Sequence, residues 1–291
     1  MPYDHGAIYR RFLDEIASTA VGPETATAFW REQGRLIAAD ARVGSPHDFL
    51  RWPSLEPFSA PESWIPQACY DALRDRPDWA SRWFPLTRDT KVGGPKDYGR
   101  DLGTSPILVQ HAYHLMRYEQ DTGRALTECD VIVEIGGGYG SFCRLLRNAG
   151  FEGLHVIYDL PHVSAIQRLY LGLSGFTEVS PAQVARRTRH GVCLVTDDGL
   201  DAVHAALADQ GLTVGFVATW SLSEAPMSVR DRIFPRFHPL CTRYLIAYQP
   251  YWDRIDNGAY FGALCRDRPD LTWRTEQMPR VADPPSLYLF A

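Results

Sequence analysis

Residues 131–140, Val-Ile-Val-Glu-Ile-Gly-Gly-Gly-Tyr-Gly, constrain the fold more than any other stretch of the chain. The first five are apolar and mostly β-branched, interrupted only by Glu134, which predicts a buried parallel strand. Glycines then end the strand, and apolar residues at helical spacing follow from Ser141. Strand, glycine turn and helix in this order are typical of a nucleotide-binding site, because glycine lets a ligand approach the backbone. A buried carboxylate at Glu134 needs a polar partner.

The spacing of the glycines separates two cofactor classes. A dinucleotide site favours Gly-x-Gly-x-x-Gly, whose third glycine packs the helix against the strand. Counted from Gly136, that third position holds Ser141, so the dinucleotide pattern is incomplete. A tight turn that binds no ligand is the remaining interpretation, and the buried strand before it disfavours this.

Strand-like and helix-like segments alternate after residue 125, which predicts a doubly wound, Rossmann-like α/β sheet in residues 126–291. Residues 1–125 read as a mainly helical region with two helices in 7–42. Residues 84–106 carry no secondary-structure signal, and a loop of that length suggests a lid. The expected strands are 131–135, 153–159, 191–196, 213–220 and 241–248, with a terminal antiparallel pair near 271–275 and 287–290.

Composition excludes several classes of partner. Lys+Arg 30 against Asp+Glu 35 argues against nucleic acid. No apolar run is long enough for a bilayer, and the N-terminus lacks the charged and apolar regions of a signal peptide. The six scattered cysteines indicate reduced core thiols and no zinc site. We therefore expect a cytoplasmic protein that acts on a small molecule without a membrane, with a homodimer as one assembly to consider.

The turn, written Glu-x-Gly-x-Gly-x-Gly, resembles the first motif of class I S-adenosylmethionine-dependent methyltransferases. With Asp159-Leu-Pro, residues 219–224 (Thr-Trp-Ser-Leu-Ser-Glu) and the Asp-Asn pair ending at Asn257, it resembles the sugar O-methyltransferase family of bacteria over residues 98–291. Asp159-Leu-Pro is also similar to small-molecule O-methyltransferases of plants and of antibiotic pathways. An acid at the tip of the second strand suits ribose hydroxyls, whether of S-adenosylmethionine or of NAD.

The resemblance implies that Glu134 lies near the ammonium of the methionine portion and that the glycines pass beneath the ribose. An acid after the third strand would bind the adenine amino group. The cofactor-binding residues expected on this basis are Glu134, Gly136, Gly137, Gly138, Tyr139, Asp159, Leu160, Thr196, Asp197, Trp220 and Ser221.

Methyl transfer to a hydroxyl calls for a general base. His111 and His114 lie three residues apart, on one face of a helix expected to start at Pro106, and Glu224 follows the fourth strand. These three are the catalytic candidates. His162 is a fourth, weaker candidate, because it is expected to face solvent. Plant-type relatives carry a catalytic histidine just after the fourth strand, which this chain lacks. A divalent ion on Asp197, Asp198 or Glu224 is an alternative, but no ligand cluster is distinctive enough to predict a metal.

The acceptor is expected to contact polar and aromatic residues near the strand ends. These are Tyr98, Ser223, Tyr248, Tyr251 and Asn257. Three alternatives stay open: an N- or C-methyltransferase of a natural-product pathway, a binder without turnover, and an NAD-dependent oxidoreductase or epimerase. Ser141 and the absence of a Tyr-x-x-x-Lys pair after the fourth strand disfavour the last.

Overall fold

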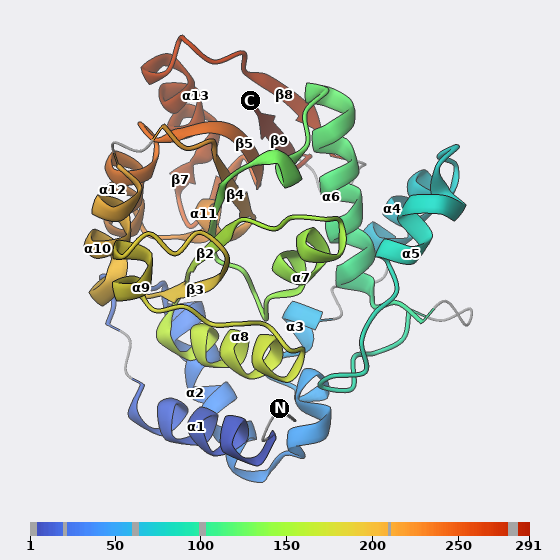
Figure 1. Cartoon of the computed structure of the whole chain (residues 1–291), viewed down its shortest axis with the longest axis vertical. Coiled ribbons are helices and arrows are strands. Elements are labelled where there is room, and N and C mark those ends of the chain that lie inside the picture. The colour runs from blue at the N-terminus through green and yellow to red at the C-terminus, as the bar shows by residue number, and fades with distance from the viewer. Residues whose placement is uncertain (1–4, 20–21, 60–63, 99–102, 209–210, 279–284) are drawn as a thin grey trace.

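The computed structural model describes residues 5–19, 22–59, 64–98, 103–208, 211–278 and 285–291. Within these ranges a seven-stranded sheet has the order β3-β2-β1-β4-β5-β9-β8, and a small β6-β7 pair lies beside it (Figure 1). This architecture confirms the predicted α/β fold. The strands are β1 (Val131–Ile135), β2 (Leu154–Tyr158), β3 (Gly191–Val195), β4 (Val214–Thr219), β5 (Cys241–Tyr248), β6 (Tyr251–Trp252), β7 (Ile255–Asp256), β8 (Arg274–Gln277) and β9 (Leu287–Phe290).

The strand order places a reversal beside β1. Strands β1 to β5 are parallel, and the chain runs outward from β1 through β2 and β3 before returning to β4 on the other side. In such sheets the crevice for a ligand opens at this reversal, outside the carboxyl ends of the strands. Strand β9 is antiparallel and lies between β5 and β8, so the far edge departs from the 3-2-1-4-5-6 order typical of dinucleotide-binding sheets.

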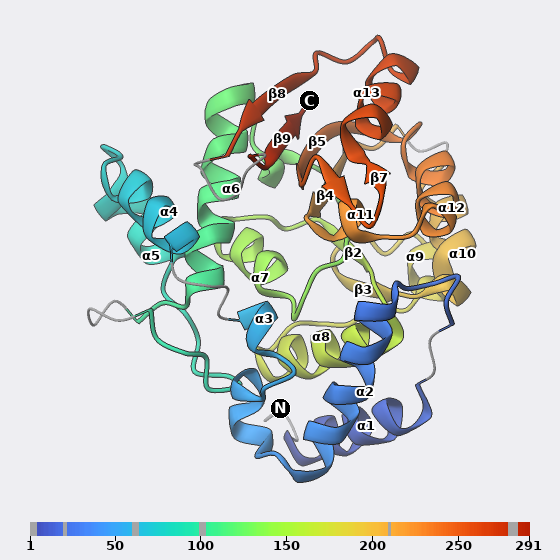
Figure 2. The same ribbon diagram turned by 180° about the vertical axis from the view of Figure 1, so that it is seen from behind.

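Helices cover both faces of the sheet, which explains why β1 and β2 are buried along their whole length (Figures 1 and 2). Val133 and Val156 face a core built with α10, α12 and α13, while Ile132 and Ile157 face α6, α7 and α8 on the other side. These helices are α6 (Pro106–Thr122), α7 (Ser141–Asn148), α8 (Pro161–Leu173), α9 (Pro181–Ala185), α10 (Asp197–Leu207), α11 (Ser221–Glu224), α12 (Met227–Phe237) and α13 (Asn257–Asp267).

The first third of the chain is helical, as predicted, and packs against the sheet domain. Its elements are α1 (His5–Ser18), α2 (Ala28–Val43), η1 (Pro46–Arg51), α3 (Glu56–Ser59), α4 (Trp64–Arg74), the π-helical turn η2 (Trp79–Trp83), α5 (Phe84–Leu86) and, after α6, η3 (Leu126–Glu128). The expected boundary near residue 125 falls between α6 and β1. No described helix is long and apolar enough to cross a membrane.

The segment interpreted as a lid is partly fixed to the sheet domain. The side chain of Asp89 is 6% exposed and pairs with Arg144 of α7 at 2.7 Å, and it also accepts a hydrogen bond from Ser105. Ser105 therefore does not cap α6 with its side chain, although α6 begins at Pro106 as predicted. Residues 99–102 of the segment lie outside the described ranges, as do residues 1–4.

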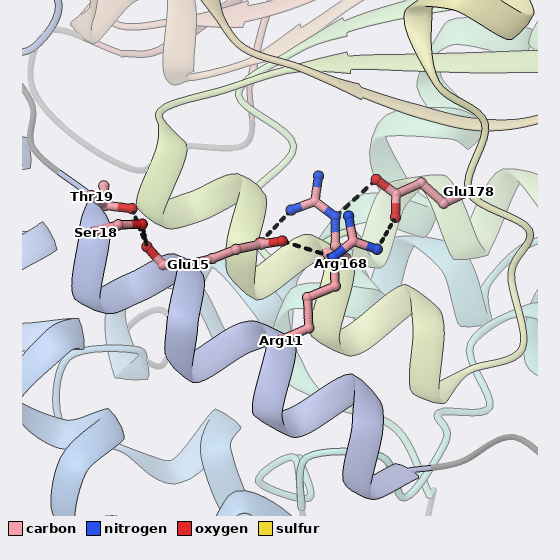
Figure 3. Close-up of polar contacts among 6 residues, drawn as sticks. All are labelled: Arg11, Glu15, Ser18, Thr19, Arg168 and Glu178. Atoms are coloured by element: carbon pink, nitrogen blue, oxygen red, sulfur yellow. Dashed lines mark hydrogen bonds and ion pairs between the residues drawn. The ribbon is translucent and has the colours of Figure 1, made fainter.

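Helix α1 docks on α8 through a four-residue ionic network (Figure 3). Glu15 accepts from Arg11 Nε at 2.9 Å and from Arg168 Nη1 at 2.5 Å. Glu178 accepts from Arg168 Nε at 2.8 Å and from Arg11 Nη1 at 3.1 Å. Because these groups are partly exposed, they orient the helix, and its stability comes mainly from the apolar face beneath, where Phe12 is buried.

Two phenylalanines test whether buried apolar contacts stabilise the helical region. Phe12 of α1 is 2% exposed in the cluster that includes α8, whereas Phe29 of α2 is 51% exposed. Phe12→Ala should lower the free energy of unfolding by about 3–5 kcal/mol. Phe29→Ala should change it by less than about 0.5 kcal/mol. Urea unfolding followed by circular dichroism measures both, and equal losses would contradict this packing.

Candidate active site

A cavity of about 450 Å³ lies at the reversal between β1 and β4. This volume is in the range of small-molecule sites. The turns after β1, β2 and β4 supply most of its lining, and α2, α3, α6 and α12 close it. The residues that line it and were predicted as site residues are Glu134, Gly136, Gly137, Gly138, Tyr139, Asp159, Leu160, Trp220, Ser221, His111 and Glu224.

The glycine turn makes a very close approach to the β4 exit loop. Gly136 has a φ of +70°, and a Cβ added there would lie 2.1 Å from the Cβ of Ser221. Ser221 in turn donates a hydrogen bond to the carbonyl of Ile135, the last residue of β1. Only glycine fits this position, so the motif at 136 is explained by steric contact as well as by ligand access.

Glu134 is 1% exposed at the floor of the cavity. Its Oε2 lies 2.7 Å from Nε2 of His155, which is the polar partner that the sequence required but did not identify. Burial lowers the pKa of His155, while Cys143 and Glu134 raise it, and the balance raises the pKa of His155 to about 10. Glu134 and His155 therefore form a buried ion pair beneath the turn.

Asp159 follows β2 and faces the same cavity. Its carboxylate accepts from the backbone N–H of Leu160 at 2.8 Å and from Gln167 Nε2 at 2.7 Å. Gln167 also donates to the carbonyl of Gly138 at 2.9 Å, which joins the two turns. Burial raises the pKa of Asp159, hydrogen bonds from Leu160 and Gln167 lower it, and the charge of Glu134 raises it. The balance raises the pKa of Asp159 to about 7.

The β4 exit loop contains a strained residue, Trp220, and is held farther along by a buried arginine. Trp220 has a φ of +73°, which is unusual for a bulky residue and is often found at functional sites. Arg230 of α12 is fully buried and donates to the carbonyls of Ser223 at 2.8 Å and Ala225 at 2.9 Å. It also donates to Asn257 Oδ1 at 2.7 Å. Ser223 and Asn257, both predicted to contact the acceptor, therefore hold the loop, and neither lines the cavity.

Two of the three catalytic candidates line the cavity. His111 Nδ1 lies 3.1 Å from Ser141 Oγ, and burial lowers the pKa of His111 to about 3, so its imidazole is neutral. Glu224 accepts from Gln249 Nε2 at 2.9 Å. Burial raises the pKa of Glu224, and hydrogen bonds from Gln249 and Trp30 lower it.

His114 lies outside the cavity lining, although it shares a helix with His111. Its Nδ1 lies 2.5 Å from the hydroxyl of Tyr288 in β9, and it is 1% exposed. His162 is also buried, at 2%, so the expectation that it faces solvent is wrong. Helix α8 begins at Pro161, so His162 belongs to its first turn and lies against Gly34 of α2.

The remaining predicted site residues do not line the cavity and contact other parts of the structure. Asp197 accepts from the hydroxyl of Tyr158 at 2.7 Å, and Thr196 stands at the N-cap of α10. Three aromatic residues expected at the acceptor site are elsewhere: Tyr98 bonds Gln67 at 3.2 Å, Tyr248 packs on Phe261 at 4.5 Å, and Tyr251 is 63% exposed.

Sequence reasoning missed a wall of the cavity supplied by the helical region. Trp30 of α2 and Phe58 of α3 line it, with ring centroids 5.3 Å apart. No motif marks these residues, because their role depends on docking of the helical region over the sheet. Neutral polar groups missed include Gln110, beside His111 on α6, and Gln249 after β5.

The electrostatic character of the lining is one-sided. Among the described residues that line the cavity, Glu134, Asp159 and Glu224 are acidic and none is Lys or Arg. In the described ranges, no three His, Cys, Asp or Glu side chains are grouped to hold a metal ion. Such a lining favours cationic and neutral ligands over anionic ones.

No family model and no curated protein matches this chain. Similar solved structures include magnesium protoporphyrin IX methyltransferase (ChlM) from Synechocystis PCC 6803 with bound SAM, with TM-score 0.42 and 14% identity over 79% of this chain and 97% of that one. The mitomycin 7-O-methyltransferase MmcR has TM-score 0.33 and 16% identity over 98% and 93%. NcsB1, an O-methyltransferase from neocarzinostatin biosynthesis, has TM-score 0.31 and 17% identity over 99% and 74%. Similarity this distant assigns no activity, so function has to be inferred from the site.

The pKa of Asp159 generates a prediction about stability. Because the folded state holds this proton more tightly than the unfolded chain, the contribution of Asp159 is favourable at low pH and is lost as pH rises through about 7. Asp159→Asn should therefore be more stable than the parent at pH 8, and the difference should shrink by roughly 1–3 kcal/mol at pH 5. Urea unfolding at both pH values measures this. Asp201→Asn, on the exposed side of α10, is the control, and parallel pH curves for Asp159→Asn and the parent would contradict the assignment.

Proposed function

We propose that this chain is an S-adenosylmethionine-dependent methyltransferase that methylates a hydroxyl of a small-molecule acceptor. The observation that carries the proposal is the acid-lined cavity at the β1–β4 reversal, with a glycine turn, the buried Glu134 and the half-buried Asp159 at adjacent strand ends. S-adenosylmethionine carries a sulfonium and an ammonium, which such a lining attracts. The pyrophosphate of NAD would find no Lys or Arg among the described lining residues.

Two further features support this cofactor over a dinucleotide. The third glycine of the dinucleotide pattern is replaced by Ser141, which lines the cavity and contacts His111. The antiparallel β9 also gives the sheet a different far edge from that of dinucleotide-binding sheets. Neither feature favours the oxidoreductase alternative.

Different residues of the site suit different parts of the cofactor. Glu134 suits the ammonium, the glycine turn leaves room for the ribose, and Asp159 suits the ribose hydroxyls. Leu160, Trp220 and Ser221 line the space between the strand ends. When bound, S-adenosylmethionine supplies the electrophilic methyl group.

His111 and Glu224 are the proposed general bases. His111 is neutral, and the contact of Nδ1 with Ser141 leaves Nε2 as the ring nitrogen for an acceptor hydroxyl. Burial raises the pKa of Glu224, which makes its carboxylate a stronger base than an exposed one. His114 is a weaker candidate because it lies outside the lining.

A sugar or another ring-shaped natural product is the proposed acceptor. Trp30, Phe58 and Trp220 offer flat apolar faces for a ring, and Gln110 and Gln249 offer neutral hydrogen-bonding groups for hydroxyls. An amine acceptor would need no strong base, so the variants of the two bases also test this alternative.

The cofactor assignment is tested by calorimetric titration. The parent should bind S-adenosylmethionine and S-adenosylhomocysteine with micromolar affinity and should not bind NAD. Asp159→Asn should weaken both adenosyl compounds by about 10-fold or more, because a charge-assisted hydrogen bond is lost. Asp201→Asn is the control. Binding of NAD in place of the adenosyl compounds would overturn the proposal.

The base assignment is tested by S-adenosylhomocysteine release with a panel of free sugars, phenols and amines. His111→Gln or Glu224→Gln should lower kcat by about 10²–10⁴-fold while cofactor affinity is retained. His114→Gln should lower the melting temperature but retain turnover, because its partner Tyr288 belongs to the core. Full turnover in both the His111 and the Glu224 variants would remove them as bases.

A further inference from the structure

His155 is a buried polar residue for which the proposed chemistry has no direct use. It lies on β2 with 0% exposure, between the apolar residues Leu154 and Val156, and its ring meets Phe151 edge-on at 6.0 Å. Burying an imidazole in a parallel strand is costly unless it is compensated. The short polar contact of the ring is that of Nε2 with Glu134 at 2.7 Å, and Cys143 of α7 also interacts with the ring.

The contact joins neighbouring strands at the floor of the cavity. Glu134 is the fourth residue of β1, and its carboxylate would otherwise be a buried, unpaired charge. Oε2 is engaged by His155 below, while the residue itself lines the cavity above. A carboxylate held on one side in this way keeps a single orientation, which is what recognition of a cation requires.

We infer that His155 is a positioning residue, which pairs with Glu134 and orients its carboxylate to receive the ammonium of the cofactor's amino-acid portion. This inference rests on the proposed function. His155 does not line the cavity, so it acts only through Glu134.

Two other titratable groups lie near Glu134 and His155, and the experiment has to distinguish their effects on binding from the effect of His155. Cys143 of α7 faces His155, and Asp159, after β2, interacts with Glu134. Asp159 titrates near neutral pH and would affect any ligand with a ribose. Two ligands that share the adenosine portion cancel this contribution: S-adenosylhomocysteine, which has the amino-acid portion, and 5′-methylthioadenosine, which lacks it.

The experiment is calorimetric titration of both ligands between pH 6 and pH 8.5. In the parent, the ratio of the two affinities should not change with pH. In His155→Gln, which keeps a hydrogen-bond donor but no charge, the affinity for S-adenosylhomocysteine should fall by about 10-fold or more at pH 6 and recover toward pH 8.5. The affinity for 5′-methylthioadenosine should stay within about twofold, and Glu134→Gln combined with His155→Gln should show no greater loss than Glu134→Gln alone.

His238→Gln is the control, because His238 is a partly buried histidine bonded to Tyr244 outside the cavity lining. Equal weakening of both ligands by His155→Gln, or unchanged or tighter binding of S-adenosylhomocysteine, would overturn the inference while leaving the proposed function intact. Failure of the parent to bind either ligand would overturn both.

A measurement on the parent covers the case in which His155→Gln does not fold. In NMR spectra of histidine-labelled protein, the His155 imidazole should stay protonated through pH 8.5, and its signals should shift with S-adenosylhomocysteine more than with 5′-methylthioadenosine. A neutral ring at pH 7, or equal shifts with the two ligands, would overturn the inference.

Discussion

The contact between Gly136 and Ser221 is the constraint on which the rest of the site depends. It brings the end of β1 against the loop that leaves β4, and a side chain at 136 would force the two apart. Because β1 is paired on both sides, with β2 and with β4, neither turn can move without disturbing the centre of the sheet. The crevice between these strand ends is therefore a fixed feature of the fold.

Around this fixed centre the site contains groups that are unfavourable in a folded core. Asp159 is held where burial opposes its charge, Trp220 has a left-handed backbone, and Arg230 is buried with carbonyl and amide partners. Groups of this kind persist where the surrounding structure determines them strongly, and they concentrate at functional sites. Their clustering at one end of the sheet agrees with the proposed binding of a cationic cofactor.

The helical region completes the site. Trp30 and Phe58 reach the cavity because α1 and α2 dock on α8, through the buried face around Phe12 and the ionic network at its edge. The cavity wall that these two residues form is thus set by helix packing. Changes in that packing would alter the acceptor side of the cavity while leaving the glycine turn in place.

The sequence by itself determined the sheet. Five apolar strands alternate with helices, and their bounds agree with the structure to within one or two residues because burial on both faces leaves an unmistakable pattern. It also identified the residues of the glycine turn and Asp159 that line the cavity, since residues at strand ends in such folds share one edge of the sheet.

Only the tertiary structure decided which polar side chains reach the cavity. His111 and His114 were equal candidates on one helix, but a separation of three residues turns them about 60° apart, so one meets the cavity and the other meets Tyr288 of β9. The amino-acid composition near the strand ends favours Tyr98, Tyr251 and Asn257 as acceptor contacts, but composition does not reveal the direction in which a side chain points. The partner of Glu134, His155, lies on the next strand, and cross-strand register is set by pairing that no local pattern reveals.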